Sequence, residues 1–288
     1  MNSNNISGPR NFEVEINENF ESWDAIANMH AQGSGSEFYR IEQWLAGESK
    51  IAPWEIEELG PVKGKSLLHL QCHIGTDTLS WAREGAIVTG LDFSKQAINE
   101  ARRFAEILDF PEAKFVVSHV KDAVAALKGE KFDIIYTGRG ALCWLPNLDE
   151  WASICAQLVK PGGVLYLEEC HPFSDLMEVV GTGSEKELKI HYNMFSKKPV
   201  TFHDQGSYAD KDAKTGIRKS HCWGHGFGEI MNSLINNGFN IEMMNEREES
   251  FFEPWEGFLE YSQPNYWKFK EEIVPIPMSF TLRARREK

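Results

Sequence analysis

The chain has 288 residues, of which 42% are hydrophobic and 25% are charged, a composition typical of a globular protein and unlike a disordered or collagen-like chain. With 30 Lys and Arg against 43 Asp and Glu, the net charge of −13 disfavours nucleic acid or an anionic membrane as a partner. No apolar run is long enough to span a membrane, and the polar N-terminus has no signal-peptide pattern. Five scattered cysteines without a CxxC pair favour a reducing, cytoplasmic setting over a disulfide framework or a zinc site.

The first 170 residues change from a leader to a regular alternation of strands and helices. Residues 1–20 are predicted to be a disordered or loosely attached tail. A helical pattern from Trp23 to Leu45 follows, and Gly33–Ser36 interrupts it as a hinge. Strands are predicted at 66–71, 86–91, 114–118, 132–137 and 164–169, with helices at 76–83, 95–108 and 148–158. This alternation, with short turns between elements, predicts a parallel sheet covered on both faces.

The regular alternation stops after Cys170, and the next segment is predicted to be an insertion. Short β-like pieces at 188–195, 200–203 and 218–223 are separated by polar turns. A helix at 229–236 and strands at 239–245 and 277–283 then resume the pattern, and an aromatic-rich segment at 251–269 lies between those two strands. The chain therefore divides into a leader (1–60), an α/β core (61–170), an insertion (171–227) and a C-terminal part of the core (228–288) with an aromatic insertion at 251–276.

The turn after the first strand is the first place to look for a ligand, because open parallel sheets bind ligands beyond the carboxyl ends of their strands. The dinucleotide pattern G-x-G-x-x-G would need glycine at 71, 73 and 76, where this chain has Gln, His and Thr, so a pyrophosphate cradle is disfavoured. Asp92 ends the second strand, where one carboxylate accepts hydrogen bonds from two ribose hydroxyls. The alternative is that Asp92 caps the following helix, for which Ser94 is the predicted N-cap.

Three segments together resemble the class I, Rossmann-like, S-adenosylmethionine-dependent methyltransferases. They are LLHLQCHIGTDTLSWAREGAIVTGLDFS, FDIIYTGRGALCWLPNL and LVKPGGVLYLEE. The family's G-x-G-x-G loop would fall on 71, 73 and 75, of which only Gly75 is glycine here. The resemblance covers residues 60–170 well, the last helix and strands more loosely, and looks like bacterial small-molecule methyltransferases with a Gln-x-His loop. It implies an α/β fold with a seven-stranded, mostly parallel, doubly wound sheet, an antiparallel last strand and an inserted β-rich and aromatic lid.

The resemblance also implies S-adenosylmethionine as the cofactor and a set of residues that bind it. Asp92 would hold the ribose, and Phe93, Val120 and Asp122 would surround the adenine. The remaining residues that it implies are Trp23 and Tyr39 in a helical lid over the cofactor, Gln71, Cys72, His73 and Gly75 in the first loop, Ser94, and Thr137 and Gly138 after the fourth strand. Asp122 equally suits a helix N-terminus, and the His73 ring is favoured to bond loop backbone in place of a glycine turn.

Arg139 and Trp144 follow the fourth strand and keep more than one interpretation. Arg139 either pairs with the cofactor carboxylate or an acidic substrate, or lies at the surface. Trp144 either packs in the core or, with the aromatics of the leader, places a ring near the sulfonium, where a cation is attracted by the π face.

Two histidines are candidate general bases, because an unperturbed pKa of ~6.5 suits proton removal. His171 follows the fifth strand, and His225 lies in a glycine-containing loop with His221. Structural roles remain open for both, and without a third ligand in the sequence no metal site is expected.

The expected reaction is in-line methyl transfer to a small molecule. The lid segments suggest a planar or apolar acceptor, although a minor core under a long connection would also explain their aromatic residues. We expect a monomer or homodimer with no nucleic-acid or membrane partner. The alternatives are a nicotinamide-dependent oxidoreductase and a non-catalytic cofactor-binding protein.

Overall fold

Seven strands form one central sheet in the computed structural model, which describes residues 12–263 and 265–287. Their order is β10-β13-β5-β4-β1-β2-β3, and β13 runs antiparallel to both of its neighbours, whereas the pairs among β1 to β5 are parallel. The strands are β1 (Ser66–Leu70), β2 (Ile87–Asp92), β3 (Lys114–Val117), β4 (Phe132–Gly138), β5 (Val159–Cys170), β10 (Phe239–Arg247) and β13 (Ser279–Arg286). The predicted seven-stranded, mostly parallel sheet with an antiparallel last strand is confirmed.

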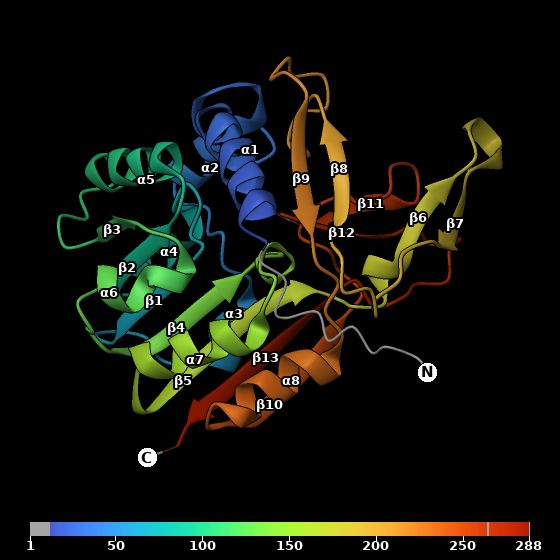
Figure 1. Cartoon of the computed structure of the whole chain (residues 1–288). Coiled ribbons are helices and arrows are strands. Elements are labelled where there is room, and N and C mark those ends of the chain that lie inside the picture. The colour runs from blue at the N-terminus through green and yellow to red at the C-terminus, as the bar shows by residue number, and fades with distance from the viewer. Residues whose placement is uncertain (1–11, 264, 288) are drawn as a thin grey trace, which may run out of the picture.

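Helices cover both faces of this sheet (Figure 1). Leu67 of β1 belongs to the same apolar cluster as Trp81, and the next residue, Leu68, belongs to the cluster on the other face, with Trp151 and Leu234. This alternation follows from the period of two along a strand, and it makes each buried strand apolar on both sides. One face carries α3 (Pro53–Leu59), α4 (Thr76–Arg83) and α5 (Lys95–Ile107); the other carries α6 (Ala123–Ala126), α7 (Leu148–Leu158) and α8 (Phe227–Asn236).

Three two-stranded hairpins extend the molecule beyond the carboxyl ends of β4 and β5 (Figure 1). They are β6 (Met177–Val180) with β7 (Glu187–Ile190), β8 (Val200–Asp204) with β9 (Arg218–Cys222), and β11 (Leu259–Gln263) with β12 (Tyr266–Phe269). The insertion is β-rich as predicted, but β6 was not predicted and β7 ends before 195. Trp255, Leu259 and Phe269 form a small separate core with Met278, so a minor core accounts for part of the aromatic segment.

The leader is more helical than predicted. Helix α1 (Glu13–Gln32) covers residues predicted as tail; positions 1–11 of that prediction lie outside the described residues. The predicted break is present, because α1 ends at Gly33 and a 3-10 turn (Ser34–Ser36) precedes α2 (Ile41–Leu45). The start of α1 escaped prediction because tertiary contacts stabilise it: Asn19 exchanges two hydrogen bonds with the His221 backbone in β9. Of the described helices, none is long and apolar enough to cross a bilayer.

Candidate active site

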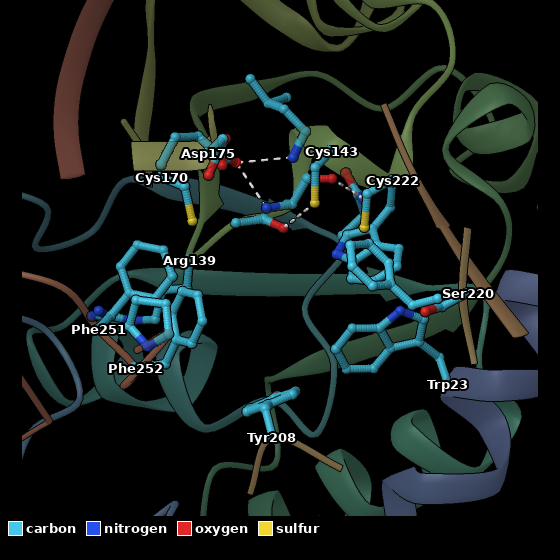
Figure 2. Close-up of a pocket in the computed structure, with 18 of the residues that line it drawn as sticks. Trp23, Arg139, Cys143, Cys170, Asp175, Tyr208, Ser220, Cys222, Phe251 and Phe252 are labelled. Carbon is cyan, nitrogen blue, oxygen red and sulfur yellow. Dashed lines mark hydrogen bonds between the residues drawn. The ribbon is translucent and has the colours of Figure 1, made fainter. Parts of the chain in front are cut away.

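A single continuous cavity of about 900 Å³ lies at the carboxyl ends of β1, β4 and β5, under α1 and the inserted hairpins. One end is lined by the loop after β1 and by Asp92, and the other is walled by aromatic residues and thiols, some of which Figure 2 labels. The predicted cofactor residues that line it are Trp23, Tyr39, Gln71, Cys72, His73, Asp92, Phe93 and Gly138. Gly75, Ser94, Val120, Asp122 and Thr137 were also predicted but do not line it.

The loop after β1 keeps a glycine-type backbone with only one glycine. Gln71, His73 and Gly75 have φ angles of 58°, 48° and 78°, all in the left-handed region. A Cβ on Gly75 would lie 2.7 Å from the Cβ of Ala101, so this position admits no side chain. Positions 71 and 73 do carry side chains in the same backbone region, at a cost that the surrounding contacts must offset.

Gln71 ties this loop to the end of β4. Its Nε2 donates to the Ala141 carbonyl at 2.9 Å. Its Oε1 is buried and has no hydrogen-bond partner among the described residues. An unpaired buried acceptor is costly, so this oxygen stands out from the ordinary, hydrogen-bonded buried polar atoms of a folded protein.

The His73 ring bonds a second histidine and not the loop backbone, which corrects the favoured prediction. Its Nε2 lies 2.9 Å from Nδ1 of His30 in α1, and His30 Nε2 lies 2.6 Å from Ser207 Oγ. Burial lowers the pKa of His73 to about 4 and lowers that of His30 well below its ordinary value. Both rings are therefore neutral near pH 7 and do not repel a cationic ligand in the cavity.

Asp92 is buried at the end of β2, with both of its oxygens turned to backbone donors. Oδ2 accepts from the His73 amide at 2.9 Å and Oδ1 from the Ser94 amide at 2.8 Å. Each oxygen keeps a second acceptor site. Burial raises the pKa of Asp92 to about 6. The cap of α5 is Ser94, as predicted, since its hydroxyl accepts from the Ala97 amide at 3.0 Å.

Of the three residues predicted to surround the adenine, Phe93 is the one that lines the cavity. Its ring stacks on His119 at 5.5 Å and meets Phe20 of α1 edge-on at 5.7 Å. Val120 is buried in the core, and Asp122 is exposed in the 3-10 turn η2 (Val120–Asp122). The structure therefore does not bring these two residues together with Phe93 around the cavity.

Arg139 is not a surface residue, which removes one of its three interpretations. Its side chain is 17% exposed and lies 3.0 Å from Asp77, 2.9 Å from Glu55 and 2.8 Å from Glu168. It also donates to the Tyr266 hydroxyl and to the Lys50 carbonyl, so all five of its N–H groups are used. No N–H of Arg139 remains for an acidic substrate or a cofactor carboxylate in this arrangement.

Three carboxylates, those of Glu55, Asp77 and Glu168, surround the single cation of Arg139. The sequence analysis did not single out these acidic residues. Glu55 and Glu168 are fully buried. Burial and the neighbouring Glu168 raise the pKa of Glu55 to about 8, so Glu55 is largely protonated near neutral pH. No local pattern could have shown this contact, because α3 brings Glu55 to Arg139 from 84 residues away.

Helix α1 joins the core to the insertion across the top of the cavity. On the core side, Asp24 accepts from the Ser94 hydroxyl at 2.7 Å and the Gln96 amide at 3.0 Å, at the N-terminus of α5. On its cavity side, Trp23 meets His73 edge-on at 5.3 Å and Trp144 at 5.1 Å. In Figure 1, α1 lies between α5 and β9.

The two histidines predicted as bases have different surroundings. His171 does not line the cavity: its Nε2 lies 2.8 Å from Glu246, and its Nδ1 accepts from the Phe173 amide at 3.1 Å. His225 lines the cavity, but its Nε2 donates to the Leu145 carbonyl at 2.9 Å and its Nδ1 lies 3.3 Å from Glu229. His171 therefore lies away from the cavity, whereas His225 reaches it with an Nδ1 that is buried and makes no hydrogen bond within the described residues.

A sheet of this order, with a carboxylate ending β2 beside a strained loop after β1, defines the class I methyltransferase fold. The sequence agrees, because residues 68–165 match the family described as "Methyltransferase domain". A ubiquinone biosynthesis O-methyltransferase from Salmonella arizonae is 30% identical over 235 residues, which cover 79% of this chain and 91% of the relative. One from Escherichia coli is 30% identical over 244 residues, covering 82% and 95%.

The chain belongs to the S-adenosylmethionine-dependent methyltransferases, and S-adenosylmethionine is its methyl donor. It is thus a methyltransferase and not a nicotinamide-dependent oxidoreductase. Two solved structures share its fold. A methyltransferase from Mesorhizobium loti has a TM-score of 0.55 at 21% identity, covering 84% of this chain and 100% of its own. One from Clostridium acetobutylicum has a TM-score of 0.55 at 13% identity, covering 93% and 99%.

Proposed function

We propose that the chain methylates a hydroxyl group of a small, planar aromatic molecule, with the cofactor held at the Asp92 end of the cavity and the acceptor at its aromatic end. The observation that carries this proposal is the continuity of the cavity, which runs from Asp92 past Gly138 to Phe251 and Phe252. A donor and an acceptor that are held side by side in one cavity can be oriented for in-line transfer.

The residues at the Asp92 end fit S-adenosylmethionine. Asp92 has acceptor sites left for the two ribose hydroxyls, and Gln71 Oε1 is an unpaired buried acceptor suited to the ammonium group of the methionine part. Trp23 and Tyr39 of the leader line the cavity, which supports the prediction that they cover the cofactor. When bound, the sulfonium supplies the methyl group. The neutral His30 and His73 rings add no positive charge beside it.

The other end of the cavity suits a flat, apolar ring. Tyr192, Phe202, Phe251, Phe252 and Trp223 line it, and they come from the insertion and from the segment before β11. Aromatic walls stack on planar ligands and exclude water. The choice of oxygen as the accepting atom is supported by the relatives, which are named O-methyltransferases. Arg139 has no free N–H with which to bind an anionic acceptor.

Product analysis with methyl-labelled S-adenosylmethionine tests this proposal. The acceptors are benzene rings of matched size that carry a hydroxyl, an amino, a thiol or a carboxylate group. We expect label only in the methyl ethers of the hydroxylated rings. Label on nitrogen or sulfur alone, or in no ring compound, would contradict the proposal.

A further inference from the structure

Asp175 is an acidic residue of the cavity that was not predicted as a site residue. It lies in the 3-10 turn η4 (Ser174–Leu176), directly after β5, where the sheet opens into the cavity. Figure 2 shows Asp175 with Cys170, Cys143 and Cys222 on the side of the cavity opposite Trp23. A carboxylate therefore stands in the aromatic and thiol-lined half that we assign to the acceptor.

Asp175 differs from the other acidic residues of the cavity in having a free carboxylate. Asp77 is paired with Arg139, and Asp92 and Glu169 each accept from two backbone amides. The two remaining acidic residues accept hydroxyl hydrogen bonds, Glu178 from Tyr192 and Asp204 from Ser220. Within residues 12–263 and 265–287, no hydrogen bond or ion pair reaches the Asp175 carboxylate.

The groups that surround Asp175 make it a weaker acid than an ordinary aspartate. Asp175 is exposed to the open cavity, yet the protein around it reduces the hydration of its carboxylate and raises its pKa to about 7, while His225, two residues before α8, opposes part of that rise. Glu169 and Cys170 of β5 are titratable groups that also interact with it. A carboxylate with these neighbours is basic enough to hold a proton and still ionised in part near neutral pH.

An aromatic hydroxyl needs a base, because a phenol with a pKa of ~10 stays protonated near pH 7 and is then a poor nucleophile. We propose that Asp175 is the general base of the methyl transfer, an inference that rests on the proposed function. The O–H bond breaks and its proton moves to the Asp175 carboxylate. The electron pair on that oxygen forms the O–CH3 bond, while the electrons of the breaking S–CH3 bond stay on sulfur and give a neutral thioether. A base with a pKa near the working pH serves such a step well.

The test is the Asp175→Asn variant, assayed with the hydroxylated ring that the wild type methylates best. We expect kcat to fall by roughly 10²–10⁴-fold, the usual contribution of a general base, with unchanged affinity for S-adenosylmethionine. The wild-type rise of kcat with pH through about 7 should disappear in the variant. A nitrophenol of similar shape, already ionised at the assay pH, should restore most of the lost rate, because it needs no base.

The matched control is Glu187→Gln, which makes the same chemical change on β7 at an exposed ion pair with Lys189. This variant should keep the wild-type rate. If Asp175→Asn keeps more than half of the wild-type kcat on the ordinary phenol, or if the nitrophenol restores nothing, the base role is wrong while the proposed function stands. If the wild type methylates no hydroxylated ring, the proposed function fails and this role falls with it. A second variant, Asp175→Glu, separates loss of the carboxylate from loss of stability. Because it keeps a carboxylate, it should retain more activity than Asp175→Asn.

Discussion

Replacing Arg139 by Met leaves three carboxylates without their shared cation. Glu55 and Glu168 are fully buried, and Asp77 is mostly so, which means that water cannot take the place of the guanidinium. Removing one partner of a buried ion pair typically costs about 3–5 kcal/mol, since it strands charge in a medium that solvates it poorly. We therefore expect Arg139→Met to lower the free energy of unfolding by about 4 kcal/mol near pH 8.

The penalty should shrink in acid, because a carboxyl group that binds a proton no longer needs the cation. Burial raises the pKa of Glu55 to about 8 and also raises that of Glu168, and Arg139 opposes both shifts, so its removal raises both pKa values further. The folded variant should then bind more protons than the folded wild type as the pH falls from about 8 to about 5.5. The stability that the variant loses relative to the wild type should therefore be smaller at the lower pH.

Urea unfolding, followed by tryptophan fluorescence at both pH values, measures this penalty directly. The control is Arg285→Met, which removes an exposed ion pair with Glu242 and should cost less than about 1 kcal/mol at either pH. A loss below 1 kcal/mol for Arg139→Met near pH 8, or one that does not change with pH, would refute the buried-cluster reasoning.

Two further predictions concern the loop after β1 and a buried acid at the end of β5. Gly75→Ala should lose at least about 2 kcal/mol and lower Tm, because its Cβ would overlap Ala101 at a positive φ; an unchanged Tm would be inconsistent with the loop geometry. Burial raises the pKa of Glu169 from 4.5 to about 8, so the folded state holds a proton that the unfolded state has lost, and wild-type stability falls as pH rises between those values. Between about pH 5.5 and about pH 8, the free energy of unfolding measured in urea should therefore fall by about 3 kcal/mol less in Glu169→Gln than in the wild type. An equal fall in the two proteins would reject the shifted pKa.

The strands of the central sheet could be predicted from the sequence, because the patterns that indicate a strand lie within its own residues. Short apolar runs bounded by turns placed β1 to β5 within a few residues, although β5 starts earlier than predicted, at Val159. The register between β4 and β5 shifts there, which lets the strand include Pro161–Gly163. Asp92 was singled out for the same reason, since a strand end can be read from its own residues, whereas Gly138 was predicted from the resemblance.

Side-chain relations across the chain could not be read in this way. Nothing near His73 indicates that its ring meets His30, and nothing near Asp175 indicates that its carboxylate stays unpaired in a cavity. The left-handed backbone at Gln71 was also hidden, because residues other than glycine adopt it only when surrounding contacts impose it. Residues outside the strand ends were predicted mainly by resemblance, and there the structure separated Val120 from the cavity.

The most direct test of the account is a calorimetric titration of S-adenosylmethionine into the wild type and into Asp92→Asn at about pH 7.5 and about pH 5.5. The wild type should bind at the higher pH and bind more weakly at the lower one, because a neutral Asp92 carboxyl is a poorer acceptor for ribose hydroxyls and its pKa is about 6. The variant should bind roughly 10-fold or more weakly at the higher pH, the loss expected for a hydrogen bond to a charged group, and should show little further change in acid. Equal affinity for the two proteins at the higher pH would contradict the assignment of Asp92, and with it the placement of the cofactor at this end of the cavity.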